Sequence, residues 1–201
     1  MQPTPPRSLA LTFALAVSTP VVAGQGFGPQ QVITTSANGA TSVHAVDLDG
    51  DGDVDVLSAS GLDAQIAWYE NLGSGSFGPE QVITTAAGTK RMVYAADLDG
   101  DGDADVVWAA SVDKVAWCEN LGLGAFGPEQ VITTVAYSVQ CVYATDLDGD
   151  GDVDVLSACP DGVGKVAWYE NLGLGAFGPE QVITTPADGE RWGRGRAVGF
   201  G

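Results

Sequence analysis

Short apolar stretches alternate with stretches of glycine and aspartate along most of the chain. Residues 42–46 and 54–59 are rich in valine, alanine and leucine, and they flank an acidic segment at 47–55. Residues 66–69 and 80–85 are two further stretches with apolar or β-branched residues, and a Gly- and Ser-rich turn separates them. Because such residues favour strands, the pattern predicts four short strands within about 50 residues.

This pattern of four strands occurs three times because the sequence repeats itself. The segment at 27–35 returns with a single Gln-to-Glu change from Phe77, Phe126 and Phe177. Four antiparallel strands in about 40–50 residues are the size of one β-propeller blade, so we expect an all-β fold of three four-stranded blades. The expected elements of the repeat region 24–185 are an outer strand at 27–35 and blades at about 36–85, 86–134 and 135–185. Because propellers usually close with about four to eight blades, three blades would form an open, incomplete propeller.

The segment between the first two strands of each blade carries five aspartates in nine residues. Carboxylates at this spacing need a cation. Oxygen ligands in a flexible loop suit calcium better than magnesium, which demands octahedral geometry, or zinc, which prefers nitrogen and sulfur. An Asp-Gly pair also forms ordinary hairpin turns, but such turns do not explain three copies of the same five aspartates. The glycines, such as Gly52, allow the positive φ that a wrapping loop requires.

The residues at the first, third and fifth positions of each loop are expected to contribute side-chain oxygens, the residue at the seventh position its backbone carbonyl, and the residue at the ninth position closes the shell. The candidate ligands are Asp47, Asp49, Asp51, Asp53, Asp55, Asp97, Asp99, Asp101, Asp103, Asp105, Asp146, Asp148, Asp150, Asp152 and Asp154. One Ca²⁺ in each loop makes about three ions for the chain.

The surroundings of the loop decide which kind of calcium loop it is. An EF-hand carries a glutamate at position 12 and a helix on each side, whereas position 12 here is Ser58, Trp108 or Ser157 and the flanks favour strands. The motif Asp-x-Asp-Gly-Asp-Gly-x-x-Asp, followed by Phe-Gly and Gly-Pro, resembles the FG-GAP or VCBS repeats of integrin-type β-propellers over roughly residues 26–185. The resemblance implies that the same fifteen aspartates bind calcium.

The two ends of the chain differ from the repeats. Residues 1–23 resemble a signal peptide, with Arg7, an apolar run at 9–22 and small residues at the end. The run is shorter than the ~20 residues of a spanning helix, so we expect export of a chain that starts at Gly24 and is secreted or held at the cell surface, without membrane insertion. An uncleaved N-terminal anchor is the alternative. Residues 186–201 are rich in glycine and arginine and are expected to be a disordered tail.

The formal net charge of the chain is −18, and 15 of its 26 acidic residues lie in the three loops. Three bound Ca²⁺ ions would leave a charge of about −12. An acidic chain of this kind is not expected to bind nucleic acid or an anionic membrane surface.

A tryptophan and a Glu-Asn pair recur at the same place in each blade. The large indole ring suits the space between neighbouring sheets, whereas an exposed row of tryptophans would bind sugar rings, and both interpretations remain open. Two carboxylates can perform glycosidase chemistry, but a catalytic residue does not need to recur in every repeat, so the glutamates are expected to be structural. The residues are Trp68, Trp117, Trp168, Glu70, Glu119 and Glu170.

Residues that break the repeat are few. His44 takes the place of Tyr94 and Tyr143, so we expect it to pack as an aromatic ring. Cys141 and Cys159 lie on the strands around the third loop. If Asp146 pairs with Asp154, the two cysteines face each other and form a disulfide. The alternative is that all three cysteines, including Cys118, are small buried hydrophobic residues.

The sequence therefore predicts a secreted, calcium-binding repeat module for extracellular binding or adhesion, because the resembled family serves in integrin heads and bacterial surface proteins. Its ligand would be an extracellular protein or glycan. An accessory propeller of a polysaccharide-degrading enzyme and a purely structural spacer are the alternatives. No catalytic constellation breaks the repeat, so the chain is not expected to be an enzyme. The exposed faces of the first and last blades are expected to promote self-association or to make the chain poorly soluble alone. The alternative is that the outer strand and the tail fold over these faces and give a stable monomer.

Overall fold

The computed structural model describes residues 28–85, 88, 91–110, 114–136, 138–159 and 164–184. The expected signal peptide at 1–23 and the expected tail at 186–201 lie outside these ranges. Residues up to Gln31 belong to a separate unit, and all the described strands belong to the unit that begins at Val32. None of the described residues forms a helix with the length and hydropathy that a membrane crossing requires.

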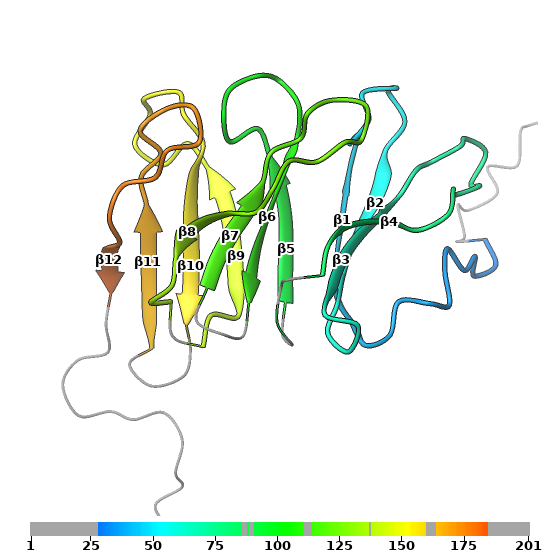
Figure 1. The fold of residues 1–201 in the computed structure, drawn as a ribbon, viewed down its shortest axis with the longest axis horizontal. Coiled ribbons are helices and arrows are strands. Elements are labelled where there is room, and N and C mark those ends of the chain that lie inside the picture. Colours follow the sequence, from blue (N-terminus) through cyan, green and yellow to red (C-terminus); the bar gives the residue numbers. More distant parts are fainter. Residues whose placement is uncertain are drawn as a thin grey trace, which may run out of the picture. The chain divides into compact units, whose positions relative to one another are not determined.

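The described residues form three four-stranded antiparallel sheets, and in each sheet the strands follow one another in chain order (Figure 1). The first sheet consists of β1 (Ala40–Val46), β2 (Asp55–Ser60), β3 (Gln65–Tyr69) and β4 (Gln81–Thr84). The second consists of β5 (Arg91–Ala96), β6 (Asp105–Ala110), β7 (Lys114–Cys118) and β8 (Gln130–Thr133). The third consists of β9 (Cys141–Thr145), β10 (Asp154–Cys159), β11 (Lys165–Tyr169) and β12 (Gln181–Thr184). The predicted all-β fold of three four-stranded blades, open and not closed into a barrel, is confirmed.

The first strands of the three sheets lie beside one another, β1 against β5 and β5 against β9. Their rings form a column: His44 lies 4.5 Å from Tyr94, and Tyr94 lies 4.9 Å from Tyr143, measured between ring centroids. Tilted rings at these distances attract each other. The prediction that His44 packs as an aromatic ring is therefore confirmed.

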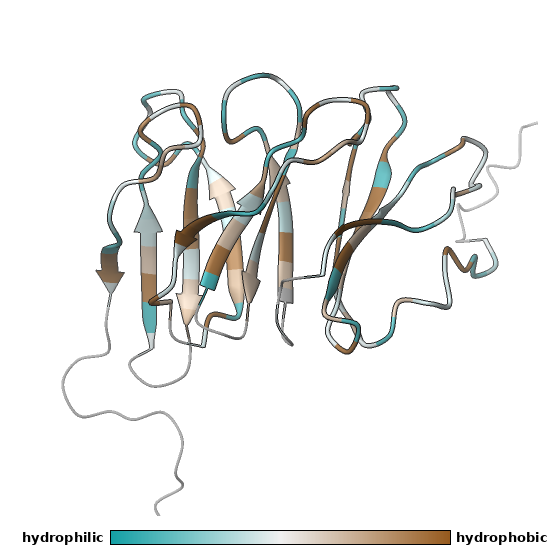
Figure 2. Cartoon of the chain, viewed as in Figure 1, coloured by the Kyte–Doolittle hydropathy of each residue, from teal (hydrophilic) through white to brown (hydrophobic). Residues whose placement is uncertain are grey.

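Apolar residues concentrate on the strands, and much of the polar sequence lies in the loops that connect them (Figure 2). Two apolar clusters fill the spaces between the sheets, one between the first and second sheets and one between the second and third. Trp68 lies in the first cluster and Trp117 in the second, and both are 2% exposed. The packing interpretation of these two tryptophans is confirmed.

Each buried tryptophan reaches a glycine in the last turn of the next sheet. A Cβ atom built on Gly124 would lie 2.3 Å from Trp68, and one on Gly175 would lie 2.4 Å from Trp117. Both glycines also have positive φ. Glycine is thus required here twice, once for the backbone conformation and once to admit the indole ring. We call one such contact between two sheets, with its tryptophan and glycine, a joint.

The expected outer strand at 27–35 is wrong for the residues that the structure describes, because residues 28–35 form no strand. In each sheet the corresponding segment forms the fourth strand and pairs with the strand directly before it, as Gln81 does with Trp68. Residues 28–35 make no such pairing with the described strands. Val32 and Ile33 are accordingly exposed.

The expected disulfide between Cys141 and Cys159 is also wrong. Asp154 pairs with Thr145 rather than Asp146, so Cys141 lies opposite Ala158, and no disulfide joins the two cysteines. A shift of one residue turns a side chain to the other face of a strand. Cys141 is exposed and Cys159 is buried.

The close contact between Trp68 and Gly124 predicts that one methyl group added at Gly124 destabilises the protein. Gly124→Ala should lower the free energy of unfolding because the new Cβ collides with Trp68, at about 1–3 kcal/mol for overpacking. Gly149→Ala is the matched control, since Gly149 also has positive φ but no atom lies within 4 Å of its added Cβ. Denaturation in EDTA removes any metal effect. Equal losses in the two variants would contradict the packing role of Gly124.

Candidate functional site

The acidic loop between the first two strands of each sheet is stabilised by hydrogen bonds from its backbone N–H groups to its own aspartates. Asp47 accepts hydrogen bonds from the backbone N–H groups of Gly50 (Oδ1, 2.8 Å) and Gly52 (Oδ2, 3.0 Å). Asp49 Oδ1 accepts one from Asp51 at 3.2 Å. Both glycines have positive φ, so the chain curls back over the carboxylates. The second and third loops repeat these contacts.

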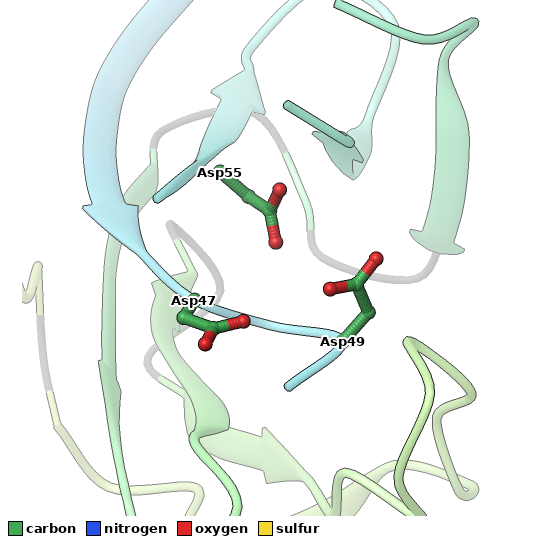
Figure 3. A group of neighbouring side chains, drawn as sticks. All are labelled: Asp47, Asp49 and Asp55. Atoms are coloured by element: carbon green, nitrogen blue, oxygen red, sulfur yellow. The ribbon is translucent and has the colours of Figure 1, made fainter. Parts of the chain in front are cut away.

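Three carboxylates converge in each loop. Figure 3 shows Asp47, Asp49 and Asp55 turned toward a common space, and in each loop three carboxylate oxygens lie within 4.8 Å of one another. Oxygens bound to one Ca²⁺ at 2.3–2.6 Å are at most about 5 Å apart. Each cluster could therefore hold a metal ion. The clusters are Asp47, Asp49 and Asp55; Asp97, Asp99 and Asp101; and Asp146, Asp148 and Asp154.

The clusters contain nine of the fifteen predicted ligands. The aspartate at the fifth position joins the cluster in the second loop only, as Asp101, whereas Asp105, at the ninth position of that loop, does not. The aspartates at the seventh position belong to no cluster, and in each loop a carboxylate oxygen of this residue lies beside the glycine of the turn before β4, β8 or β12. This orientation fits the expectation that the seventh residue would offer its backbone carbonyl. The predicted residues outside the clusters are Asp51, Asp53, Asp103, Asp105, Asp150 and Asp152.

Electrostatics also favour a cation in these loops. The pKa of Asp49 is raised by burial and by the charges of the other aspartates of its loop. The pKa of Asp99 is raised by burial and by neighbouring charges that include Glu119. Burial raises the pKa of Asp105 to about 7. A raised pKa means that the charged carboxylate is destabilised, and a bound cation would remove that penalty.

The aspartate at the ninth position of each loop also accepts hydrogen bonds from the backbone. Asp55 Oδ2 accepts the backbone N–H of Leu48 at 2.9 Å, and Oδ1 accepts that of Asn71 at 2.8 Å. Asp105 and Asp154 make the same two contacts, and all three side chains are fully buried. Each one therefore ties the start of the acidic loop to the turn that follows the third strand. This role does not require a metal ion.

A pocket of about 320 Å³ opens between the first and second sheets, beside the first acidic loop. Its polar side chains come from the first sheet and its loop. Leu123, in the turn between β7 and β8, reaches it from the second sheet. The lining residues are Asp49, Asp51, Trp68, Glu70, Gln81 and Leu123. Carboxylates, an amide, an aliphatic side chain and a small part of a buried indole thus line one space.

Leu123, which lines the pocket, has a backbone conformation that is unfavourable for a non-glycine residue. Its φ is +54°, in the left-handed region, and its side chain is 89% exposed. A non-glycine residue pays for this conformation, and an exposed leucine gains no core packing in return. Leu174 occupies the same position in the third sheet with the same φ, whereas the first sheet has Ser74 there. Strain of this kind is concentrated at functional sites.

Among the residues that line the pocket, the sequence predicts the aspartates as metal ligands, leaves Trp68 open between core packing and sugar binding, and predicts a structural role for Glu70. Gln81 and Leu123 are pocket residues that the sequence did not predict. The signal that could have found Leu123 is the change from Ser-Gly-Ser at 74–76 to Leu-Gly-Ala at 123–125, an apolar residue in a turn. That this turn faces the previous sheet is visible only in the structure.

Repeated four-stranded sheets with an acidic loop at each first hairpin define a β-propeller-like repeat protein. The model of the FG-GAP-like repeat family matches residues 47–108, 97–157 and 146–199. The chain belongs to this family, and the predicted resemblance is confirmed. No curated protein matches the chain significantly.

A solved structure with a similar fold belongs to a lectin of Agrocybe aegerita, described by its specific recognition of non-reducing terminal N-acetylglucosamine. The two chains are 28% identical over 72% of this chain, with a TM-score of 0.56. The match spans 38% of the lectin. The present chain thus corresponds to well under half of that protein.

Aspartates of one loop differ in whether they hold the backbone, so we expect their replacement to lower the free energy of unfolding by different amounts. In EDTA, Asp105→Ala should lower the free energy of unfolding by about 3 kcal/mol, because two buried N–H groups lose their acceptor. Asp101→Ala is the control: its side chain is exposed and, within the described part of the chain, accepts a hydrogen bond only from the backbone N–H of Asp103, so a loss of about 0.5–1 kcal/mol is expected. Chemical denaturation measures both. Similar losses would show that Asp105 does not hold the loop.

Proposed function

We propose that the chain is a secreted, calcium-binding module that binds the ends of glycans in the pocket between its first and second sheets. The pocket is the observation that carries the proposal. A sugar presents hydroxyl groups and apolar C–H faces together. The carboxylates and the amide of Gln81 can hydrogen-bond hydroxyls, while the exposed Leu123 offers apolar contact.

Two further observations support glycan binding. The left-handed, exposed Leu123 stands at the rim of this pocket, where a ligand would give its side chain something to cover. The lectin with a similar fold recognises non-reducing terminal N-acetylglucosamine. We therefore take terminal N-acetylglucosamine as the first sugar to test.

The chemistry of the candidate ligand atoms supports calcium binding. Each cluster consists of carboxylate oxygens in a flexible, glycine-containing loop, which is the environment that Ca²⁺ prefers. Asp49 belongs to the first cluster and also lines the pocket. An ion bound there would fix the orientation of Asp49 and reduce its charge toward a neutral sugar. Export is proposed from the signal-like pattern of residues 1–23.

Calcium binding is expected to be measurable and stabilising. Isothermal titration should show about three ions per chain, with dissociation constants near 10⁻⁴–10⁻³ M. At ten times the dissociation constant each site adds about 1.4 kcal/mol to stability, so EDTA should lower the melting temperature. Asp97→Ala should remove about one ion and leave the other two. Absence of calcium uptake, or a melting curve indifferent to EDTA, would contradict this part of the proposal.

Glycan binding is expected to depend on the rim of the pocket. Leu123→Ala should weaken binding of N-acetylglucosamine-terminated oligosaccharides about tenfold, or about 1.4 kcal/mol, because apolar contact is lost. Leu121→Ala is the matched control, since Leu121 lies in the same turn and is exposed but does not line the pocket. Both leucines are exposed, so neither variant should melt earlier.

The measurement is a titration in millimolar calcium and in EDTA, with galactose-terminated oligosaccharides as the comparison ligand. Weaker binding in EDTA would link the first metal cluster to the pocket through Asp49. Equal affinities of the Leu123 and Leu121 variants would move the site away from this pocket. No binding of any tested oligosaccharide by the unmodified chain would reject glycan recognition and leave the calcium result unaffected.

A further inference from the structure

The first and third sheets each expose, on their outer faces, residues whose counterparts are buried between sheets. On the first strands, Val93 is 3% exposed and Val142 is 2% exposed, because each faces the sheet before its own. Val43 is the corresponding residue of β1, and it is 69% exposed. The next inward-facing position shows the same contrast, since Ala95 and Ala144 are buried and Ala45 is exposed. We call the face of the first sheet around Val43 and Ala45 the front face.

The third sheet shows the converse. In the first two sheets the side chains that face the following sheet are almost fully buried: Leu57, Ala59 and Trp68 in one, and their counterparts in the other. In the third sheet, Leu156, Ala158 and Trp168 hold these positions and are only half-buried. We call this the rear face. It has the same make-up as the two rear faces that the chain covers internally.

A hydrogen bond completes each internal joint. Asn120 Nδ2 donates to the carbonyl of Leu48 at 2.8 Å, and Asn171 Nδ2 donates to that of Leu98 at 2.7 Å. In both cases an asparagine of the later sheet reaches the acidic loop of the earlier one. The corresponding donor and acceptor at the two ends are Asn71, beside the front face, and the carbonyl of Leu147, beside the rear face. The chain thus carries both halves of a contact that it makes twice within itself.

We propose that a second copy of this chain docks head to tail, with the rear face of one copy packed on the front face of the next. Leu156 and Ala158 would meet Val43 and Ala45 of the second copy, in the way that Leu57 and Ala59 meet their counterparts on β5. The contact is heterologous, since different surfaces meet, and it forms a ring if the rotation closes and a chain of copies otherwise.

The contact on the first sheet involves its innermost strand, β1. Farther out, side chains on the same face are already buried: Ser58 is 4% and Ser60 is 2% exposed on β2, and Tyr69 is 2% exposed on β3. On β1, next to the column of aromatic rings, Val43 and Ala45 are exposed. Association limited to this strand is expected to depend on concentration rather than to be permanent.

Light scattering over micromolar to near-millimolar concentrations of the purified chain tests the proposal. The unmodified chain should grow in mass to dimers or larger assemblies. Val43→Asp on the front face and Ala158→Glu on the rear face should each stay monomeric, because each places a charge in the joint. Val131→Asp is the matched control: Val131 is also exposed, but it lies on β8 of the middle sheet, and this variant should associate like the unmodified chain.

Mixing decides the geometry. Each single variant retains one intact face, so an equimolar mixture of V43D and A158E should form a dimer and nothing larger. An unmodified chain that stays monomeric throughout would overturn the proposal. Association of A158E alone would overturn the head-to-tail arrangement, because it would mean that two front faces meet. V43D changes an exposed residue, so an unchanged melting temperature verifies that its loss of association is not a loss of folding. The assay contains no glycan and is independent of the proposed function.

Discussion

A four-stranded sheet with apolar side chains on both faces is stable in water only where neighbours cover it, and this constraint shapes the whole chain. The three sheets satisfy it by repeating one joint, in which a tryptophan of the earlier sheet lies against a glycine of the later one. Two apolar clusters result, each shared by two sheets. The joint also creates the pocket, because the turn that carries Gly124 brings Leu123 over the side chains of the previous sheet.

The acidic loops depend on the sheets and in turn hold them in order. Asp55 and its two counterparts are buried because both oxygens accept backbone N–H groups, one from the loop and one from the turn after the third strand. Asn120 and Asn171, which start those turns, then reach the loop of the preceding sheet. Loop, turn and neighbouring sheet are therefore connected by buried hydrogen bonds. Such bonds are costly to break, because the N–H groups they satisfy would remain buried.

Differences between the repeats carry as much information as their similarity. Ser74 is replaced by Leu123 and Leu174 in the later turns, which are the turns that face a preceding sheet. The proposed glycan contact and the inter-sheet joint thus share one turn. The middle sheet is covered on both faces, whereas Val43 at one end and Trp168 at the other are less buried than their counterparts. The same joint that builds the interior leaves complementary surfaces at the two ends.

The sequence by itself determined the elements and the chemistry of the loops. Alternation of apolar stretches with Asp-Gly and Gly-Pro turns is local, so it predicted four strands per repeat, and the spacing of the aspartates predicted three acidic clusters, such as Asp47, Asp49 and Asp55. Tertiary structure decided what depends on partners distant in the chain. A register shift of one residue separated Cys141 from Cys159, residues 28–35 formed no strand although their sequence matches that of β4, β8 and β12, and the pocket arose where Leu123 meets the preceding sheet. Such contacts follow from three-dimensional packing, which repeat spacing does not encode.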